Sequence, residues 1–144
     1  TEKIKTTGNT NGIAFTQALQ TRDFEGLAFV NLVDFDMLYG HRRDVAGYAA
    51  AATEFDRFLT GFLPGMREDD VLMITADHGC DPSYLKTTDH TREYVPWLVC
   101  GKHIRPGSLG TRLSFATIAQ TVCAYLGVDA SSLDGQSAWE ELKA

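Results

Sequence analysis

Aspartate and histidine side chains that could bind a metal ion follow an apolar run in the middle of the chain. Residues Val71–Ile74 are apolar and predict a buried strand, and Asp77 and His78 come soon after it. Open α/β sheets place their ligands at such strand ends. A second imidazole, that of His90, lies in the loop that follows. One carboxylate and two imidazoles form a suitable ligand set for a divalent ion, so this region predicts a metal site.

The same arrangement occurs earlier in the chain. Residues Val30–Val33 run into Asp34 and Asp36, and His41 follows Asp36 by five residues. A lone Asp-His-Gly is weak evidence, because a buried aspartate beside a histidine is often only a hydrogen-bonded pair. Here three of the four histidines follow predicted strands or lie in adjoining loops, each with an aspartate nearby in the sequence. The two strand ends together predict a two-metal site, and mixed oxygen and nitrogen ligands favour manganese or zinc over magnesium.

Other polar residues near these motifs have simpler explanations. His103 follows a glycine and a lysine and is expected at the surface. A soft thiolate ligand is unnecessary in a mixed oxygen and nitrogen site, so Cys80 is interpreted as structural. Asp89 either fixes the ring of a neighbouring histidine or caps its own loop. Lys86 and Arg92 are candidate contacts for an anionic ligand, and they are equally well explained as ion pairs or exposed loop charges.

Composition supports one compact domain and excludes two classes of partner. The chain has 144 residues, of which 44% are hydrophobic, and it can therefore bury a real core. Its net charge of -6 argues against a nucleic-acid surface. No apolar run reaches the roughly 18 residues that a membrane helix requires. The three cysteines are odd in number and show no paired spacing, which suits the reducing cytoplasm, where we expect this protein.

Hydrophobic periodicity alternates between strand-like and helix-like segments. Helices are expected from Thr10 to about Arg22, from Arg42 to the residues before Pro64, from Ser114 to Leu126, and around Trp139 and Leu142. Buried strands are expected at Leu27–Val33 and Val71–Thr75. A third strand is expected at Tyr94–Cys100, and because it contains Pro96 it either lies at an edge or contains a bulge. This order predicts an α/β fold with a mainly parallel sheet flanked by helices, organised as a single domain over residues 1–144.

The motifs resemble those of the alkaline phosphatase superfamily, and within it they are most similar to the phosphopentomutases. The matching stretches cover most of residues 27–98 and are Asn31–Asp36, Gly40–Tyr48, Thr75–Gly79 and Thr88–Pro96. The resemblance implies that Asp36, His41 and His90 hold one metal, while Asp77 and His78 hold the other. It selects Asp36 over Asp34, which is then expected to pack or form hydrogen bonds nearby.

The phosphopentomutases are much longer than this chain, which resembles only the C-terminal part of their metal-binding core. The first strand with its aspartate ligand, the phosphorylated threonine and the cap domain would lie in the absent part. No catalytic residue is therefore expected in this chain, and it is expected to be inactive alone. We also expect the exposed apolar faces of Leu27–Val33 and Val71–Thr75 to favour self-association, or association with the missing N-terminal part.

By resemblance, the full-length protein would be an isomerase of nucleoside salvage that uses two manganese ions per active site. It would interconvert ribose 1-phosphate and ribose 5-phosphate, and the deoxyribose forms, so its partner is a pentose phosphate. Two alternatives remain at this stage. One is another metal-dependent phosphomutase or phosphatase of the superfamily, such as the phosphoglycerate mutase type. The other is a metal-binding fragment without catalysis.

Overall fold

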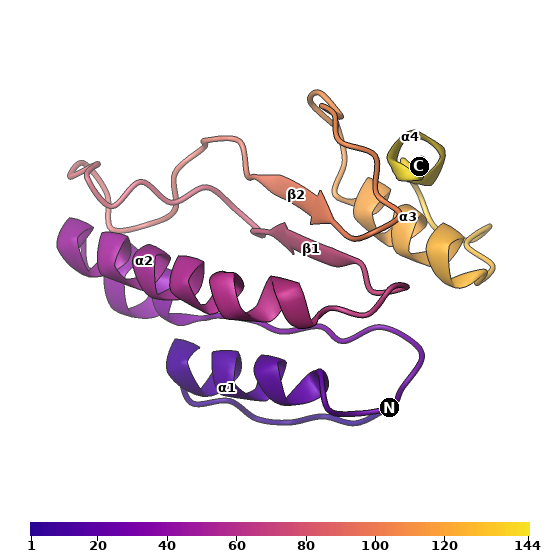
Figure 1. The fold of residues 1–144 in the computed structure, drawn as a ribbon. Helices are drawn as coiled ribbons and strands as arrows, with labels where there is room; N and C mark the ends of the chain where they lie inside the picture. The colour runs from indigo at the N-terminus through magenta and orange to yellow at the C-terminus, as the bar shows by residue number, and fades with distance from the viewer. The chain divides into compact units, whose positions relative to one another are not determined.

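The computed structural model describes all 144 residues, which divide into two compact units. The first unit contains residues 1–24, 29–67 and 73–98, and the second contains residues 25–28, 68–72 and 99–144. Figure 1 shows the order of the elements along the chain. The prediction of a single domain stays a prediction, and each unit is described separately below.

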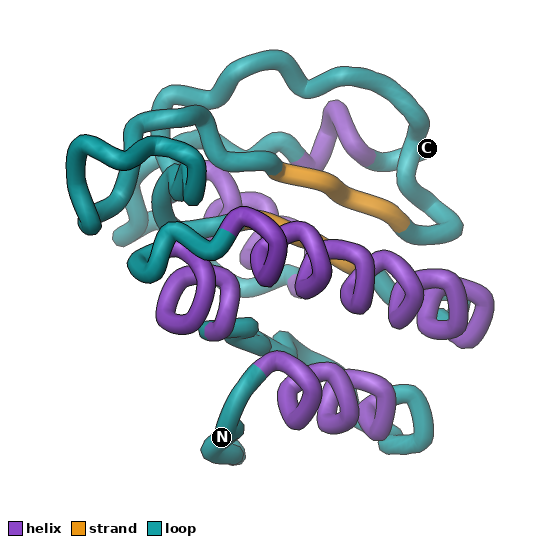
Figure 2. The backbone as a smooth tube through the Cα atoms, turned by 90° about the vertical axis from the view of Figure 1, so that its left-hand side faces the viewer, coloured by secondary structure: helices purple, strands orange, loops and turns teal.

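Helices dominate the first unit. They are α1 (Asn9–Leu19), the π-helix η1 (Phe35–Gly40), α2 (Val45–Phe62) and the short 3-10 helix η2 (Leu63–Gly65). Figure 2 shows α1 and α2 as separate helices of this unit, and they are in contact. The Gln20 side chain donates a hydrogen bond of 2.6 Å to the Phe62 carbonyl, and Thr10 donates one of 3.2 Å to Glu54. These bonds attach the two ends of α1 to the middle and the end of α2.

The predicted end of α2 before Pro64 is confirmed, whereas its start lies at Val45, three residues after the expected Arg42, and the start of α1 is also shifted. Asp44 caps α2 by accepting a 2.8 Å hydrogen bond from the Gly47 amide, and Pro64 lies two residues beyond the end of the helix. Helix α1 begins at Asn9, one residue before the expected cap at Thr10. The Asp34 carboxylate accepts a 2.7 Å hydrogen bond from the Asn9 amide. A side chain distant in the sequence thus accepts a hydrogen bond from a backbone amide of the first helical turn, which has no acceptor within the helix.

Two strands, β1 (Leu72–Thr75) and β2 (Trp97–Cys100), form the only sheet, and they run in opposite directions (Figure 1). Strands and helices are both present, as predicted, but the expected mainly parallel sheet is wrong. A parallel pair needs a long crossover that is usually helical, whereas residues 76–96 contain no helix. The chain simply turns back on itself. Strand β2 begins immediately after Pro96, which cannot donate to a ladder.

The expected buried strand at Leu27–Val33 is also wrong. This segment joins no ladder, and Leu27 and Phe29 are 65% and 84% exposed. Val30 and Leu32 do lie against Gly12 of α1, so one side of the segment has a packing partner. A continuous apolar run predicts burial on both faces, but a strand forms only where a neighbouring strand accepts its hydrogen bonds.

The second unit is built around α3 (Ala116–Leu126) and α4 (Trp139–Leu142). Helix α3 ends as predicted at Gly127, whose φ of 65° is a left-handed conformation that glycine adopts easily. Thr121 is fully buried, and its hydroxyl accepts a 2.9 Å hydrogen bond from the amide of Ala138, which is also fully buried. The contact joins the start of α4 to the middle of α3. No helix of the chain has the length and apolar character needed to span a bilayer.

Candidate metal centre

Asp36 lies near the middle of the group of candidate ligands. It sits in the first turn of η1, an element that the sequence did not predict. Its side chain is 32% exposed, yet its Oδ1 atom is buried and accepts no hydrogen bond. Buried carboxylate oxygens are normally satisfied, so this unpaired atom requires an explanation.

His41 follows η1 and turns one ring nitrogen toward this carboxylate. Its Nδ1 atom lies 2.6 Å from the Thr88 carbonyl, and its Nε2 atom lies 3.3 Å from Asp36 Oδ2. A carbonyl oxygen can only accept, so Nδ1 carries the hydrogen. The loop that contains Thr88 therefore fixes both the ring and its tautomer, as commonly happens beside metal-bound imidazole.

His78, soon after the end of β1, has the same orientation. Its Nδ1 atom lies 3.1 Å from the Gly79 carbonyl. Its Nε2 atom lies 3.5 Å from Asp77 Oδ1 and 4.0 Å from Asp36 Oδ1. The Asp77 carboxylate is 90% exposed, and its near partner here is the His78 ring.

His90 approaches from the long loop between the strands. Its Nε2 atom lies 3.5 Å from Asp36 Oδ1, and its ring stacks on that of His78 with centroids 3.6 Å apart. The His41 ring centroid is 5.0 Å from that of His90. Ligand atoms of Asp36, His78 and His90 all lie within 4.8 Å of one another, a spacing that one metal ion could occupy.

The structure thus brings together all five residues that the sequence singled out, but not in two separate groups. The most compact set combines Asp36 and His90 with His78, which the resemblance assigned to a different ion. Both assignments share Asp36 and His90. The division of the five ligands between two ions stays a prediction.

The arrangement of hydrogens fits a bound cation. When Nδ1 of a neutral imidazole donates to a carbonyl, the lone pair is on Nε2. In His41 and His78 this atom faces the Asp36 carboxylate, where a lone pair and an anion would repel each other. A divalent ion between them would remove that repulsion and satisfy the unpaired Asp36 Oδ1. Carboxylate oxygen and imidazole nitrogen are donors suited to manganese or zinc.

Close packing leaves room only for glycine at two positions of the centre. A methyl group on Gly40, at the end of η1, would lie 2.5 Å from the Cys80 sulfur. One on Gly79, next to His78, would lie 2.7 Å from the Glu93 carbonyl oxygen and 2.9 Å from that of Thr91. Gly79 and Thr91 also form an isolated β-bridge. These approaches hold the His78 and His90 segments together.

The residues given simpler explanations lie around the centre or away from it. Cys80 packs on Gly40, and burial, with a contribution from the Asp36 charge, raises the pKa of its thiol. Asp89 accepts a 2.8 Å hydrogen bond from the His90 amide, which lowers the pKa of its carboxyl group. Its Oδ1 atom is also 3.5 Å from His90 Nδ1, so both of its predicted roles have a contact. His103 is exposed and pairs with Glu68 at 3.8 Å.

Arg43 has a structural role at the centre that the sequence did not predict. Its guanidinium group donates hydrogen bonds to four backbone carbonyls around the centre, those of Gly40, Asp81, Thr87 and Asp89. These bonds join segments that are far apart in sequence. The sequence does not predict such a role, because every residue has a backbone carbonyl and residue type does not show which carbonyls will accept hydrogen bonds from an arginine.

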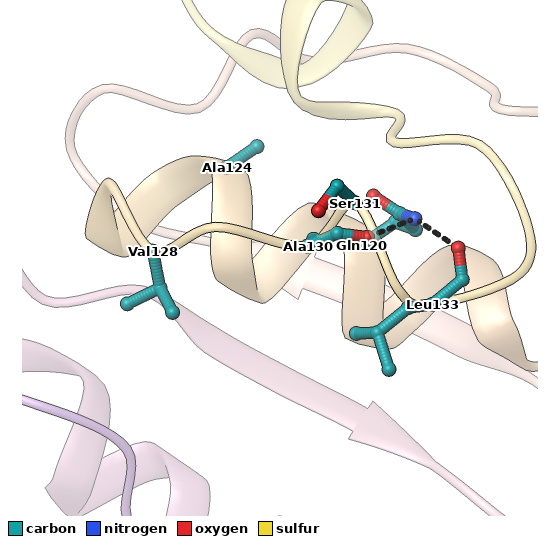
Figure 3. A pocket seen from close by; sticks show the side chains of 6 residues that line it. All are labelled: Gln120, Ala124, Val128, Ala130, Ser131 and Leu133. Atoms are coloured by element: carbon teal, nitrogen blue, oxygen red, sulfur yellow. Dashed lines mark hydrogen bonds between the residues drawn. The ribbon is translucent and has the colours of Figure 1, made fainter.

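The second unit contains a hollow of about 330 Å³ beside α3, shown in Figure 3. The Gln120 amide donates hydrogen bonds to the carbonyls of Ala130 and Leu133, and so holds the loop after α3 against the helix. None of the residues that line the hollow is ionisable: Gln120, Ala124, Val128, Ala130, Ser131 and Leu133. This hollow therefore offers no acid, base or charged group.

Known proteins resemble the chain along nearly its whole length. Residues 3–130 match the metalloenzyme superfamily. The chain is 55% identical over 138 residues to the phosphopentomutase of Acetivibrio thermocellus, an alignment covering 95% of the chain and 35% of that protein. It is 53% identical over 142 residues to that of Lachnoclostridium phytofermentans, covering 98% and 36%, and 54% identical over 129 residues to that of Vibrio cholerae, covering 88% and 31%. The chain spans about a third of the length of these curated relatives.

Proposed function

The chain belongs to the metalloenzyme superfamily, and on this premise we propose that it is the metal-binding part of a phosphopentomutase. The proposed reaction of the whole protein is the interconversion of ribose 1-phosphate and ribose 5-phosphate, including the deoxyribose forms. The observation that carries the proposal is the convergence of three imidazole rings on Asp36, which has an unpaired buried oxygen. Identities of 53–55% to proteins named phosphopentomutase support this choice within the superfamily.

The proposed ligands are Asp36, His41 and His90 for one ion, and Asp77 and His78 for the other. In support, Asp36 is within 3.5 Å of the Nε2 atoms of His41 and His90, and Asp77 is 3.5 Å from that of His78. Two manganese ions at such a centre would neutralise charge on a transferring phosphoryl group and hold the attacking and leaving oxygens. The second pair provides only two ligands, so we propose that another part of the longer protein completes it.

We propose that the nucleophile of the reaction lies outside these 144 residues. Threonines next to the centre are already engaged in holding the loop. The Thr91 hydroxyl accepts a 2.6 Å hydrogen bond from the Asp81 amide, and the Thr87 hydroxyl accepts one of 3.0 Å from the Asp89 amide. A nucleophilic hydroxyl needs an adjacent base or metal, and these two lie against backbone amides. The chain is therefore proposed to be part of an alkaline-phosphatase-like core that is inactive alone.

The partners of this part follow from its surface and from its relatives. We propose a pentose phosphate as substrate and the remaining part of the longer protein as the physical partner. The exposed apolar side chains of Leu27 and Phe29 would favour that association or, without it, self-association. The three cysteines are free, which is consistent with the reducing cytoplasm that we propose as its location.

The proposed function is tested with a coupled assay of ribose 1-phosphate conversion in the presence of manganese. The chain and a protein of the relatives' full length, containing this sequence, are assayed side by side. We expect turnover only by the longer protein, and its loss when Asp36 is replaced by Asn. If the longer protein converts another phosphate ester in preference to ribose 1-phosphate, the proposed substrate is wrong.

A further inference from the structure

We propose that Arg43 is a positioning residue of the metal centre, which fixes the loop carrying His90 relative to the turn carrying His41. This inference rests on the proposed function, because it assumes that the two histidines bind metal. The inference concerns only how this chain positions the two histidines, so it can be tested without measuring catalytic activity.

The Arg43 guanidinium group donates five hydrogen bonds, as many as it has N–H groups. Its Nε and Nη2 atoms donate to the Thr87 carbonyl at 2.8 and 2.5 Å, and Nη2 also donates to the Asp89 carbonyl at 2.5 Å. Its Nη1 atom donates to the carbonyls of Gly40 and Asp81, both at 3.2 Å. All five hydrogen bonds end on backbone carbonyls. They therefore fix the course of the backbone and do not merely neutralise a charge.

These bonds act together with the ring of His41. Thr87, Thr88 and Asp89 are consecutive, and the middle carbonyl accepts from His41 Nδ1 while the outer two accept from Arg43. Three successive carbonyls thus face one short segment of chain. The next residue after them is His90. Its place opposite Asp36 consequently depends on this attachment.

The backbone at Arg43 supports a specific role. Its φ of 56° makes it the only non-glycine residue of the chain with a positive φ. A left-handed conformation is unfavourable for a residue with a Cβ atom, and such strain persists where the surroundings over-determine it. Glycine would adopt this backbone without strain, so an arginine here indicates a requirement for the side chain. Lysine has the charge but lacks the planar fork that reaches several acceptors at once.

The adjacent arginine provides a matched control. Arg42 is exposed and donates no hydrogen bond, although it has the same charge and lies next to His41. Replacing either residue by Gly removes one positive charge from the same turn. Arg43→Gly also relieves the left-handed strain, so that the loss of the guanidinium is not confounded by a worse backbone. Arg43→Lys keeps the positive charge and removes only the planar guanidinium group with its several donors.

The experiment measures manganese binding to the 144-residue chain by calorimetry, together with the NMR signals of the histidine imidazole nitrogens in metal-free protein. We expect Arg43→Gly and Arg43→Lys to weaken manganese binding by about 10–100-fold and to shift the signals of His41 and His90. Arg42→Gly should change the affinity less than about twofold and leave those signals in place. The thermal unfolding curve of every variant gives the fraction of folded protein at the temperature of the titration.

Wild-type affinity and unshifted imidazole signals in both Arg43 variants would overturn the inference. A loss of affinity no greater than the loss of folded protein would overturn it equally. Failure of the proposed metal binding has a different signature, because the wild-type chain itself would then fail to bind manganese. In that case the metal-free imidazole signals would still show whether Arg43 positions the two rings.

Discussion

At the scale of single residues, the centre depends on which nitrogen of each imidazole is left free. His41 and His78 each use Nδ1 toward a backbone carbonyl and present Nε2 toward a carboxylate. The ring orientations thus exist before any ion arrives. Preorganised ligands lose little entropy on binding, so each ring should contribute strongly to affinity.

We therefore expect manganese affinity to fall at least tenfold when His41, His78 or His90 is replaced by Ala, because each substitution removes one donor. His103→Ala is the matched control, since His103 is exposed and pairs with Glu68. Calorimetric titration of the four variants measures the effect. Unchanged binding by the His90→Ala variant, or loss of binding by the His103→Ala variant, would refute the assignment.

Asp34 lies two residues from Asp36 but has a separate, structural role. It exchanges two hydrogen bonds with Asn9, whose side chain is buried, at 2.7 and 3.0 Å. We expect Asp34→Ala to lower the free energy of unfolding by about 1–3 kcal/mol, because both bonds to the start of α1 are weakened or lost. Urea unfolding measures this change. Manganese affinity of the folded variant should stay within about twofold of the wild type, and a tenfold loss would make Asp34 a ligand.

At the scale of elements, two glycines allow a comparison between a loop and a helix. Gly79→Ala should lower the free energy of unfolding by about 1–3 kcal/mol, because the added methyl group would overlap the backbone near Glu93. A methyl group at Gly61, in α2, would lie in open space, so Gly61→Ala should raise the free energy of unfolding by about 0.5–1 kcal/mol. Chemical denaturation of both variants measures the two changes. Equal effects would show that the close approach at Gly79 does not exist in solution.

The second unit offers a prediction about pH. Arg112 donates a 2.6 Å hydrogen bond to Glu141, and this bond lowers the pKa of the Glu141 carboxyl group from 4.5. A depressed pKa adds stability above the ordinary value, and that stability is lost as pH falls through the folded-state pKa. Glu141→Gln should therefore lower the thermal midpoint slightly at pH 7. The difference from wild type should close below about pH 4.5; a difference that widens in acid would contradict the pairing.

Local patterns predicted the helices better than the sheet. Helix α2 has its apolar spacing, cap and terminating proline within one continuous segment, so the sequence contains all the information needed. A strand depends on its neighbours. Residues 27–33 have the composition of a buried strand, but no other segment forms a ladder with them. Pairing is a property of distant residues, and one sequence without its partners cannot specify it.

At the scale of the whole molecule, the candidate ligands were identifiable and their surroundings were not. The three histidines and the pair Asp34 and Asp36 were found from residue type and expected strand-end placement, and the resemblance to the family selected Asp36. The structure brings the side chains of Asp36 and the three histidines together. The π-helix that carries Asp36 and the carbonyl contacts of Arg43 were not predicted. The Arg43 contacts to Thr87 and Asp89 form only when segments more than 40 residues apart in the sequence meet. The residue types that could bind a metal can be read from short sequence motifs, whereas the contacts that position them cannot.

The most direct test of the central claim is anomalous scattering from crystals of this chain soaked in manganese. We expect a peak within bonding distance of an Asp36 oxygen and of at least two of the Nε2 atoms of His41, His78 and His90. Asp36→Asn crystals treated in the same way should lose that peak. No anomalous density beside Asp36 at saturating manganese, or density only at surface carboxylates such as Glu68, would contradict the account.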